Sequence, residues 1–103
     1  MAIMLPYVNS AGVEAKEGYH RIDHIRYNYE NHSSMAEVKV YLDKTQALRG
    51  SDPIDIYQTF FTMNTGVNKN ISEQAYDALK TKTVVRDSKG RQRPIDFSKG
   101  KDD

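Results

Sequence analysis

The chain has 103 residues and a mass of 11.8 kDa, which is the size of one ordinary domain. It carries 15 Lys and Arg against 14 Asp and Glu, a formal net charge of +1, and no Cys. The balanced charge argues against a protein whose main task is to grip a phosphate backbone. The lack of Cys excludes disulfides, thiolate catalysis and thiolate metal sites, and no apolar run is long enough to span a bilayer.

Residues 1–8 are apolar, but they lack the basic region and the small-residue cleavage site of a secretory signal. We expect a short first strand or a docking arm here, and synthesis in a cytoplasm.

Residues 19–29 are rich in β-branched and aromatic side chains, which indicates a strand. Ile25 and Tyr27 share one face of that strand, whereas Ile22 falls on the other. A bulge near residues 23–24 would restore the register, because one extra residue flips every later side chain. The same bulge would turn His20 and His24 to opposite faces.

Alternation is cleanest in residues 35–42, a strand whose predicted core face carries Ala36, Val38, Val40 and Leu42. About one helical turn follows over residues 43–50, with Asp43 as N-cap and Gly50 as the stop. Residues 54–63 form the next strand and carry large apolar groups on both faces. Such a strand is usually central, or covered on its second face by a helix or a partner.

A helix is predicted over residues 71–82, with Asn70 as N-cap and Glu73 completing a capping box. Its apolar stripe consists of Ile71, Ala75, Ala78 and Leu79, and Tyr76 is expected at the edge of the stripe.

Residues 86–103 are rich in charge, Gly, Ser and Pro, and their only large apolar residues are Ile95 and Phe97. Two structures remain open for this segment. In one, residues 83–86 pair with residues 93–97 in a hairpin around Gly90; in the other, an extended arm orders against a neighbouring subunit. In both, the residues from 98 onward are expected to fray.

These elements together predict an α+β fold: a small antiparallel β-sheet or sandwich-like meander, with one helix in the C-terminal half and extended termini. We expect one β-rich domain over residues 1–85, followed by a charged C-terminal arm or hairpin over residues 86–103.

The sequence gives no catalytic constellation, and we expect no enzyme activity, metal or cofactor. His20 and His24 would lie about 13 Å apart along a strand, too far to share one zinc ion. The serines fall in predicted turns, and none lies on a strand-to-helix nucleophile elbow.

Tyrosine is the enriched residue, with seven copies. A thin core should not hold all of them, and tyrosine is common where a ring is covered by another subunit while its hydroxyl stays wet. Base stacking is the competing use, but few cations are interleaved, so nucleic acid is an unlikely partner. The predicted interface residues are Tyr19, Tyr27, Tyr29, Tyr41, Tyr57, Ile95 and Phe97.

The order of strand and turn residues resembles the small tail- or virion-associated proteins of tailed bacteriophages. The resemblance covers roughly residues 1–80 and rests on residues 19–22 and Ile25, residues 38–41, 47–50 and 53–54, Phe60, Phe61 and residues 75–80. It implies an assembly role, in which a copy docks on a head or tail component and on further copies in a ring.

We therefore expect a non-enzymatic virion structural protein, made in the host cytoplasm, whose partners are other virion proteins and copies of itself. The alternative is a monomeric phage-encoded module that binds a host protein, and a nucleic-acid-binding module is third.

Overall fold

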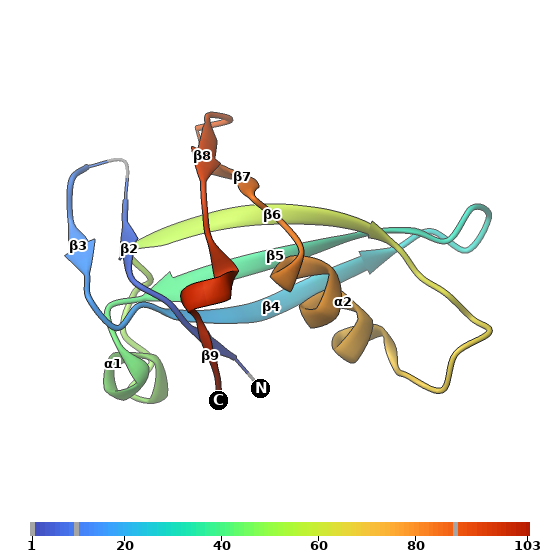
Figure 1. The fold of residues 1–103 in the computed structure, drawn as a ribbon, viewed down its shortest axis with the longest axis horizontal. Helices are drawn as coiled ribbons and strands as arrows, with labels where there is room; N and C mark the ends of the chain where they lie inside the picture. Colours follow the sequence, from blue (N-terminus) through green and yellow to red (C-terminus); the bar gives the residue numbers. More distant parts are fainter. Residues whose placement is uncertain (1, 10, 88) are drawn as a thin grey trace.

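The computed structural model describes residues 2–9, 11–87 and 89–103. It shows a small β-rich α+β domain built on one curled antiparallel sheet (Figure 1). The elements in chain order are β1 (Ile3–Met4), β2 (Tyr7–Val8), β3 (Glu14–Ala15), β4 (Tyr19–Tyr27), β5 (Ser33–Tyr41), α1 (Lys44–Leu48), β6 (Asp55–Thr62), α2 (Ile71–Lys80), β7 (Val84–Asp87), β8 (Gln92–Pro94), the 3₁₀ helix η1 (Phe97–Lys99) and β9 (Lys101–Asp102). In the described part of the chain, neither α-helix has the length and apolar character needed to cross a membrane.

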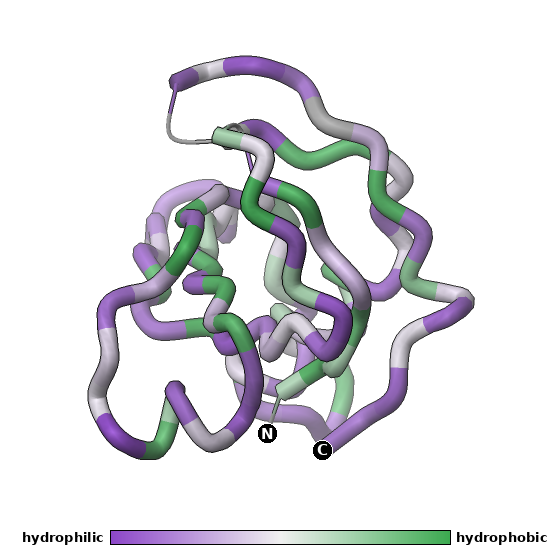
Figure 2. Tube along the Cα trace, turned by 90° about the vertical axis from the view of Figure 1, so that its left-hand side faces the viewer, coloured by the Kyte–Doolittle hydropathy of each residue, from purple (hydrophilic) through white to green (hydrophobic). Residues whose placement is uncertain are grey.

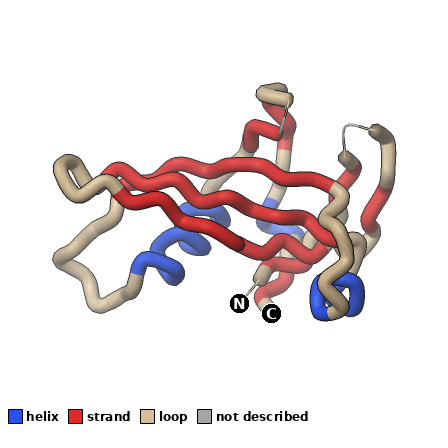
Figure 3. The backbone as a smooth tube through the Cα atoms, turned by 180° about the vertical axis from the view of Figure 1, so that it is seen from behind, coloured by secondary structure: helices blue, strands red, loops and turns tan. Residues whose placement is uncertain are grey.

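The strands of the main sheet follow the order β8-β7-β6-β5-β4-β1-β9, and β2 and β3 form a separate ribbon. Every pairing is antiparallel. Strands β4 to β8 therefore form a meander in chain order, with α2 inserted between β6 and β7. Helix α2 crosses one face of the long strands β4, β5 and β6 and leaves their other face open (Figures 1 and 3).

The predicted bulge in β4 is confirmed. The register passes from Ile22 opposite Val38 to His24 opposite Glu37, so one extra residue, Asp23, has no partner on β5. The shift places Ile22 and Ile25 on the same face of the sheet. It also leaves His20 buried and His24 exposed on opposite faces.

The core lies on the sheet face that is covered by α2 and η1, and Figure 2 shows hydrophobic and hydrophilic residues interspersed along the whole trace. Its buried residues are Ile3, Leu5, Tyr7, Val38, Val40, Tyr57, Tyr76, Leu79, Val85, Ile95 and Phe97. The prediction that Leu42 belongs to this core is wrong, since its side chain is 41% exposed. Strand β5 ends at Tyr41, and the chain then turns into Asp43, so the alternation stops one residue before Leu42.

Both predicted helix caps are present. The Asp43 side chain accepts from the Gln46 N–H, and the Asn70 side chain accepts from the Glu73 N–H, each at 2.9 Å. Helix α2 ends at Lys80, two residues before the predicted end. Tyr76, expected at the edge of the apolar stripe, is instead buried, and its hydroxyl accepts from the N–H of Ile22.

The segment after residue 86 folds onto the sheet. Of the two structures predicted for it, the hairpin forms, with Val84 opposite Pro94 and Arg86 opposite Gln92, and Gly90 in the turn has φ +77°. Ile95 and Phe97 then enter the core.

The prediction that the residues from 98 onward fray is wrong. Strand β9 pairs with β1, and Asp103 exchanges main-chain hydrogen bonds with Ala2. The Asp103 carboxylate also accepts from the Tyr19 hydroxyl and from Lys44 Nζ. The partners of this short strand come from the other end of the chain, so local composition gave no sign of it.

Candidate functional site

Five of the seven predicted interface residues are buried within the folded chain. Their side chains are covered by the chain itself and are not available to a second polypeptide in this conformation. The buried five are Tyr19, Tyr41, Tyr57, Ile95 and Phe97.

The remaining two lie at the β4–β5 turn. Tyr27 is half-buried and Tyr29 is 85% exposed. Their rings pack edge to face with centroids 4.9 Å apart, and the Tyr27 hydroxyl is hydrogen-bonded to Nδ1 of His32.

Tyr19 and Tyr41 pack under α1, against Ala47 and Ala2. Burial, followed by the hydrogen bond to the Asp103 carboxylate, raises the pKa of Tyr19 to about 12. The two tyrosines therefore close one end of the open sheet face as part of the fold.

His20 and Tyr57 form a buried polar network in the core, where the His20 ring packs against Phe97 of η1. His20 Nε2 lies 3.1 Å from the carbonyl oxygen of Leu5, and Nδ1 lies 2.9 Å from the Tyr57 hydroxyl. A carbonyl only accepts, so Nε2 carries the hydrogen and Nδ1 accepts from Tyr57. Burial lowers the pKa of His20 to about 4, which keeps the ring neutral at physiological pH.

Nearby, the Tyr7 hydroxyl donates to Asp55 at 2.7 Å. Every one of these groups is buried and hydrogen-bonded, so the network stabilises the core and presents no reactive group at the surface. Within the described ranges, no three His, Cys, Asp or Glu side chains are grouped closely enough to hold a metal ion.

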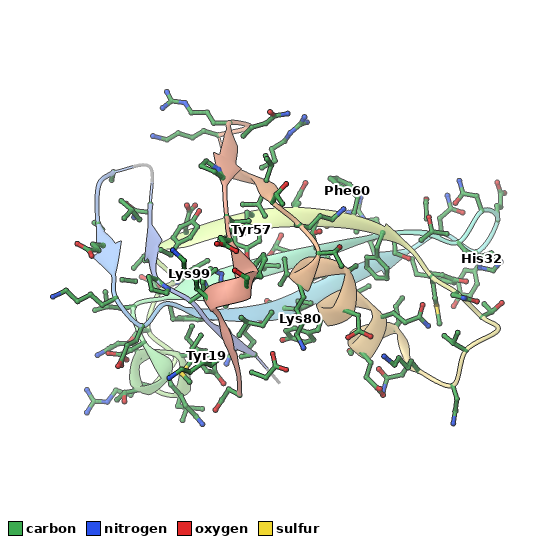
Figure 4. All side chains as sticks on the ribbon, viewed as in Figure 1. Tyr19, His32, Tyr57, Phe60, Lys80 and Lys99 are labelled. Atoms are coloured by element: carbon green, nitrogen blue, oxygen red, sulfur yellow. The ribbon has the colours of Figure 1, made fainter. Side chains whose placement is uncertain are left out.

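An exposed apolar surface lies on the sheet face opposite α2. Arg26, Met35 and Phe60 lie directly opposite one another across β4, β5 and β6. Phe60 is 57% exposed and Val84, on β7, is 46% exposed. We call Met35, Phe60 and Val84 the open-face patch; Figure 4 shows Phe60 near the outer edge of the sheet, with Tyr57 further along the same strand.

Two shallow cavities meet at the open-face patch and share Gln58 and Phe60 as lining residues. The larger, of about 550 Å³, extends along β6 towards Thr62, and the smaller, of about 320 Å³, lies between β6 and β7. Their charged lining residues are Arg26, Lys82 and Arg86, all cationic. None of these three forms a salt bridge with another described residue.

Sequence reasoning named neither Phe60 nor the rest of the open-face patch as an interface. A signal was nevertheless present, because residues 54–63 carry large apolar groups on both faces of one strand. The face of β6 that carries Tyr57 packs into the core, and the face of β6 that carries Phe60 is exposed.

Comparison with protein-family models, curated proteins and solved structures finds no match to this chain.

Proposed function

We propose that this protein is a non-enzymatic assembly subunit of a tailed-phage virion, which docks on another virion protein through the open-face patch. The observation that carries the docking surface is the exposure of Phe60 in the middle of a strand, between Met35 and Val84. Contiguous exposed apolar groups with a polar rim are typical of protein interaction sites. Covering the exposed part of such a ring contributes about 1–2 kcal/mol to association.

The virion setting rests on the resemblance of residues 1–80 to small phage tail and virion proteins. The docking surface rests on different residues from the tyrosines that the sequence suggested. The two parts of the proposal therefore have separate support and need separate tests.

Mass spectrometry of purified particles tests the virion setting. We expect this chain at a constant copy number per particle; its absence from particles that contain every other structural protein contradicts the proposal.

Complementation with Phe60→Ser tests the surface. We expect incorporation into particles to fall at least tenfold, because the variant removes the central apolar group of the open-face patch. The matched control is Leu48→Ser, which removes a side chain that is 70% exposed on α1, away from the patch. Equal incorporation of the two variants would show that docking uses another surface.

A further inference from the structure

In the described part of the chain, β7 pairs with two of the eight residues of β6, and neither of them lies beyond Gln58. The ladder of β6 with β5 continues from Asp55 to Thr62. Among the described residues, its ladder with β7 consists of Tyr57 opposite Asp87 and Gln58 opposite Arg86. Beyond that point β7 turns away with β8, as the view of the open face shows (Figure 3).

The hydrogen-bond pattern shows which main-chain groups face this edge. The N–H of Met63 donates to the carbonyl of His32 at 2.9 Å, in the same register as the β5–β6 ladder. Hydrogen-bonded pairs alternate along an antiparallel ladder, so Phe61 also bonds to β5. Phe60 and Thr62 therefore direct their N–H and C=O groups to the outer edge of β6, beyond the end of its ladder with β7.

The terminal strands of the sheet carry features that discourage strand addition. Strand β8 ends in Pro94, which has no N–H, and β9 consists of the charged residues Lys101 and Asp102. The edge of β6 carries no such residue and adjoins the exposed ring of Phe60.

The charged side chains that line the two cavities at this edge are cationic. Arg86 and Lys82 line the cavity between β6 and β7, and Arg26 lines the cavity along β6. Among the residues whose side chains the structure describes, no acidic one lines either cavity. A complementary ligand is therefore acidic.

We propose that the docking partner contributes an acidic, extended segment that adds to β6 as an antiparallel strand at Phe60 and Thr62. The inference rests on the proposed function and specifies how the partner binds. Pairing at these two residues allows roughly four main-chain hydrogen bonds. The residue opposite Phe60 shares its face and packs on the open-face patch, and flanking carboxylates lie near Arg86 and Lys82.

A designed peptide tests the mode of binding. The probe is acetyl-Glu-Glu-Val-Tyr-Val-Glu-Glu-amide, with its binding followed by amide NMR at physiological ionic strength. We expect shifts centred on residues 58–62, and slower hydrogen exchange at the amides of Phe60 and Thr62. An unchanged spectrum at millimolar peptide overturns the inference.

N-methylated peptides separate strand addition from attraction by charge alone. Alternate amides of an extended peptide point to opposite edges, so methylating the two Val amides, or instead the Tyr amide, blocks one edge at a time. We expect one of these peptides to bind about tenfold more weakly and the other to bind nearly as before. Equal affinities of the two methylated peptides would overturn strand addition.

Two variants at one position supply the matching test on the protein. Thr62→Pro removes the outward N–H without touching the β5 ladder, and Thr62→Val keeps that N–H. We expect peptide affinity to fall about tenfold for T62P and to stay within about twofold for T62V. Equal affinity of the two variants, with both shown folded by circular dichroism, overturns the inference.

A ten-residue oligothymidylate is the competing probe. Its binding at the same residues, more tightly than the peptide and with a steep salt dependence, would assign the surface to nucleic acid and overturn the inference. Particle incorporation of the Phe60 variant is measured independently. Failure of the peptide tests with a normal particle result would therefore remove only the strand-addition mode.

Discussion

The Tyr57 hydroxyl donates a hydrogen bond of 2.9 Å to Nδ1 of His20, between two side chains that are almost fully buried. The bond fixes the histidine as the Nε2–H tautomer and supplies the only polar partner within the described residues for that ring nitrogen. The core of this small domain therefore depends on a neutral histidine.

We predict that stability falls with acidification in a window set by His20. Its pKa is lowered from the usual 6.5 to about 4 by burial. The unfolded chain takes up a proton at His20 as the pH falls through 6.5, whereas the native state does so only near pH 4. The neutral ring therefore contributes its full stabilisation above pH 6.5, and this contribution is lost as the pH falls from 6.5 to about 4. The free energy of unfolding should fall by about 3 kcal/mol across this window.

Urea denaturation at several pH values, with an NMR titration of the His20 ring, checks this prediction. Asp23 and Asp77 have pKa values lowered by their hydrogen bonds to Lys39 and Lys69, so their contributions are lost only at more acid pH. His24→Gln should keep the slope, because His24 is exposed. A native His20 that titrates near pH 6.5 would refute the explanation.

Tyr57→Phe should destabilise the protein by about 1–3 kcal/mol, because it leaves His20 Nδ1 buried without a donor. The ring and its packing are otherwise kept. Chemical denaturation of the variant gives the value directly. Tyr29→Phe is the matched control, and since Tyr29 is 85% exposed, its loss of a hydroxyl should change stability by less than about 0.5 kcal/mol.

Thr59→Val should be neutral or stabilising by up to about 1 kcal/mol. The Thr59 hydroxyl is buried and has no hydrogen-bond partner among the described residues, and valine has nearly the same shape. Thermal unfolding measures the effect. A clear loss of stability in this variant would mean that the hydroxyl does have a partner in solution, such as a bound water.

Leu79→Ala should cost about 2–5 kcal/mol, since the Leu79 side chain is fully buried between α2 and the sheet. Leu48→Ala, at a leucine that is 70% exposed on α1, should cost far less. Equal effects in denaturation experiments would show that α2 does not cover the core in solution.

Local patterns predicted much of this fold. Alternation over residues 35–42 identified β5, and the mismatch between Ile22 and Ile25 was enough to predict the bulge. The caps at Asp43 and Asn70 followed from residue type, because a cap is a contact between residues three positions apart.

What could not be predicted depends on partners distant in sequence. The sequence suggested that a thin core would exclude most tyrosines. In the structure, buried Tyr57 is hydrogen-bonded to His20, 37 residues away, and buried Tyr7 is hydrogen-bonded to Asp55, 48 residues away. Likewise, the open-face patch became visible only once the structure showed which face of β6 α2 covers.

The extra residue in β4 has a consequence for how this chain tolerates insertions and deletions. Before Asp23 the even-numbered side chains of β4 face the core, and after Asp23 the odd-numbered ones do. Bulges also increase the local twist of a strand. A chain lacking Asp23 would close the bulge and keep Ile22, Ile25 and Tyr27 on one face, because Ile22 and His24 would then be consecutive in the ladder with β5. The sheet therefore tolerates the loss of one residue at this point of β4, and that residue contributes nothing to the core because the side chain of Asp23 is exposed.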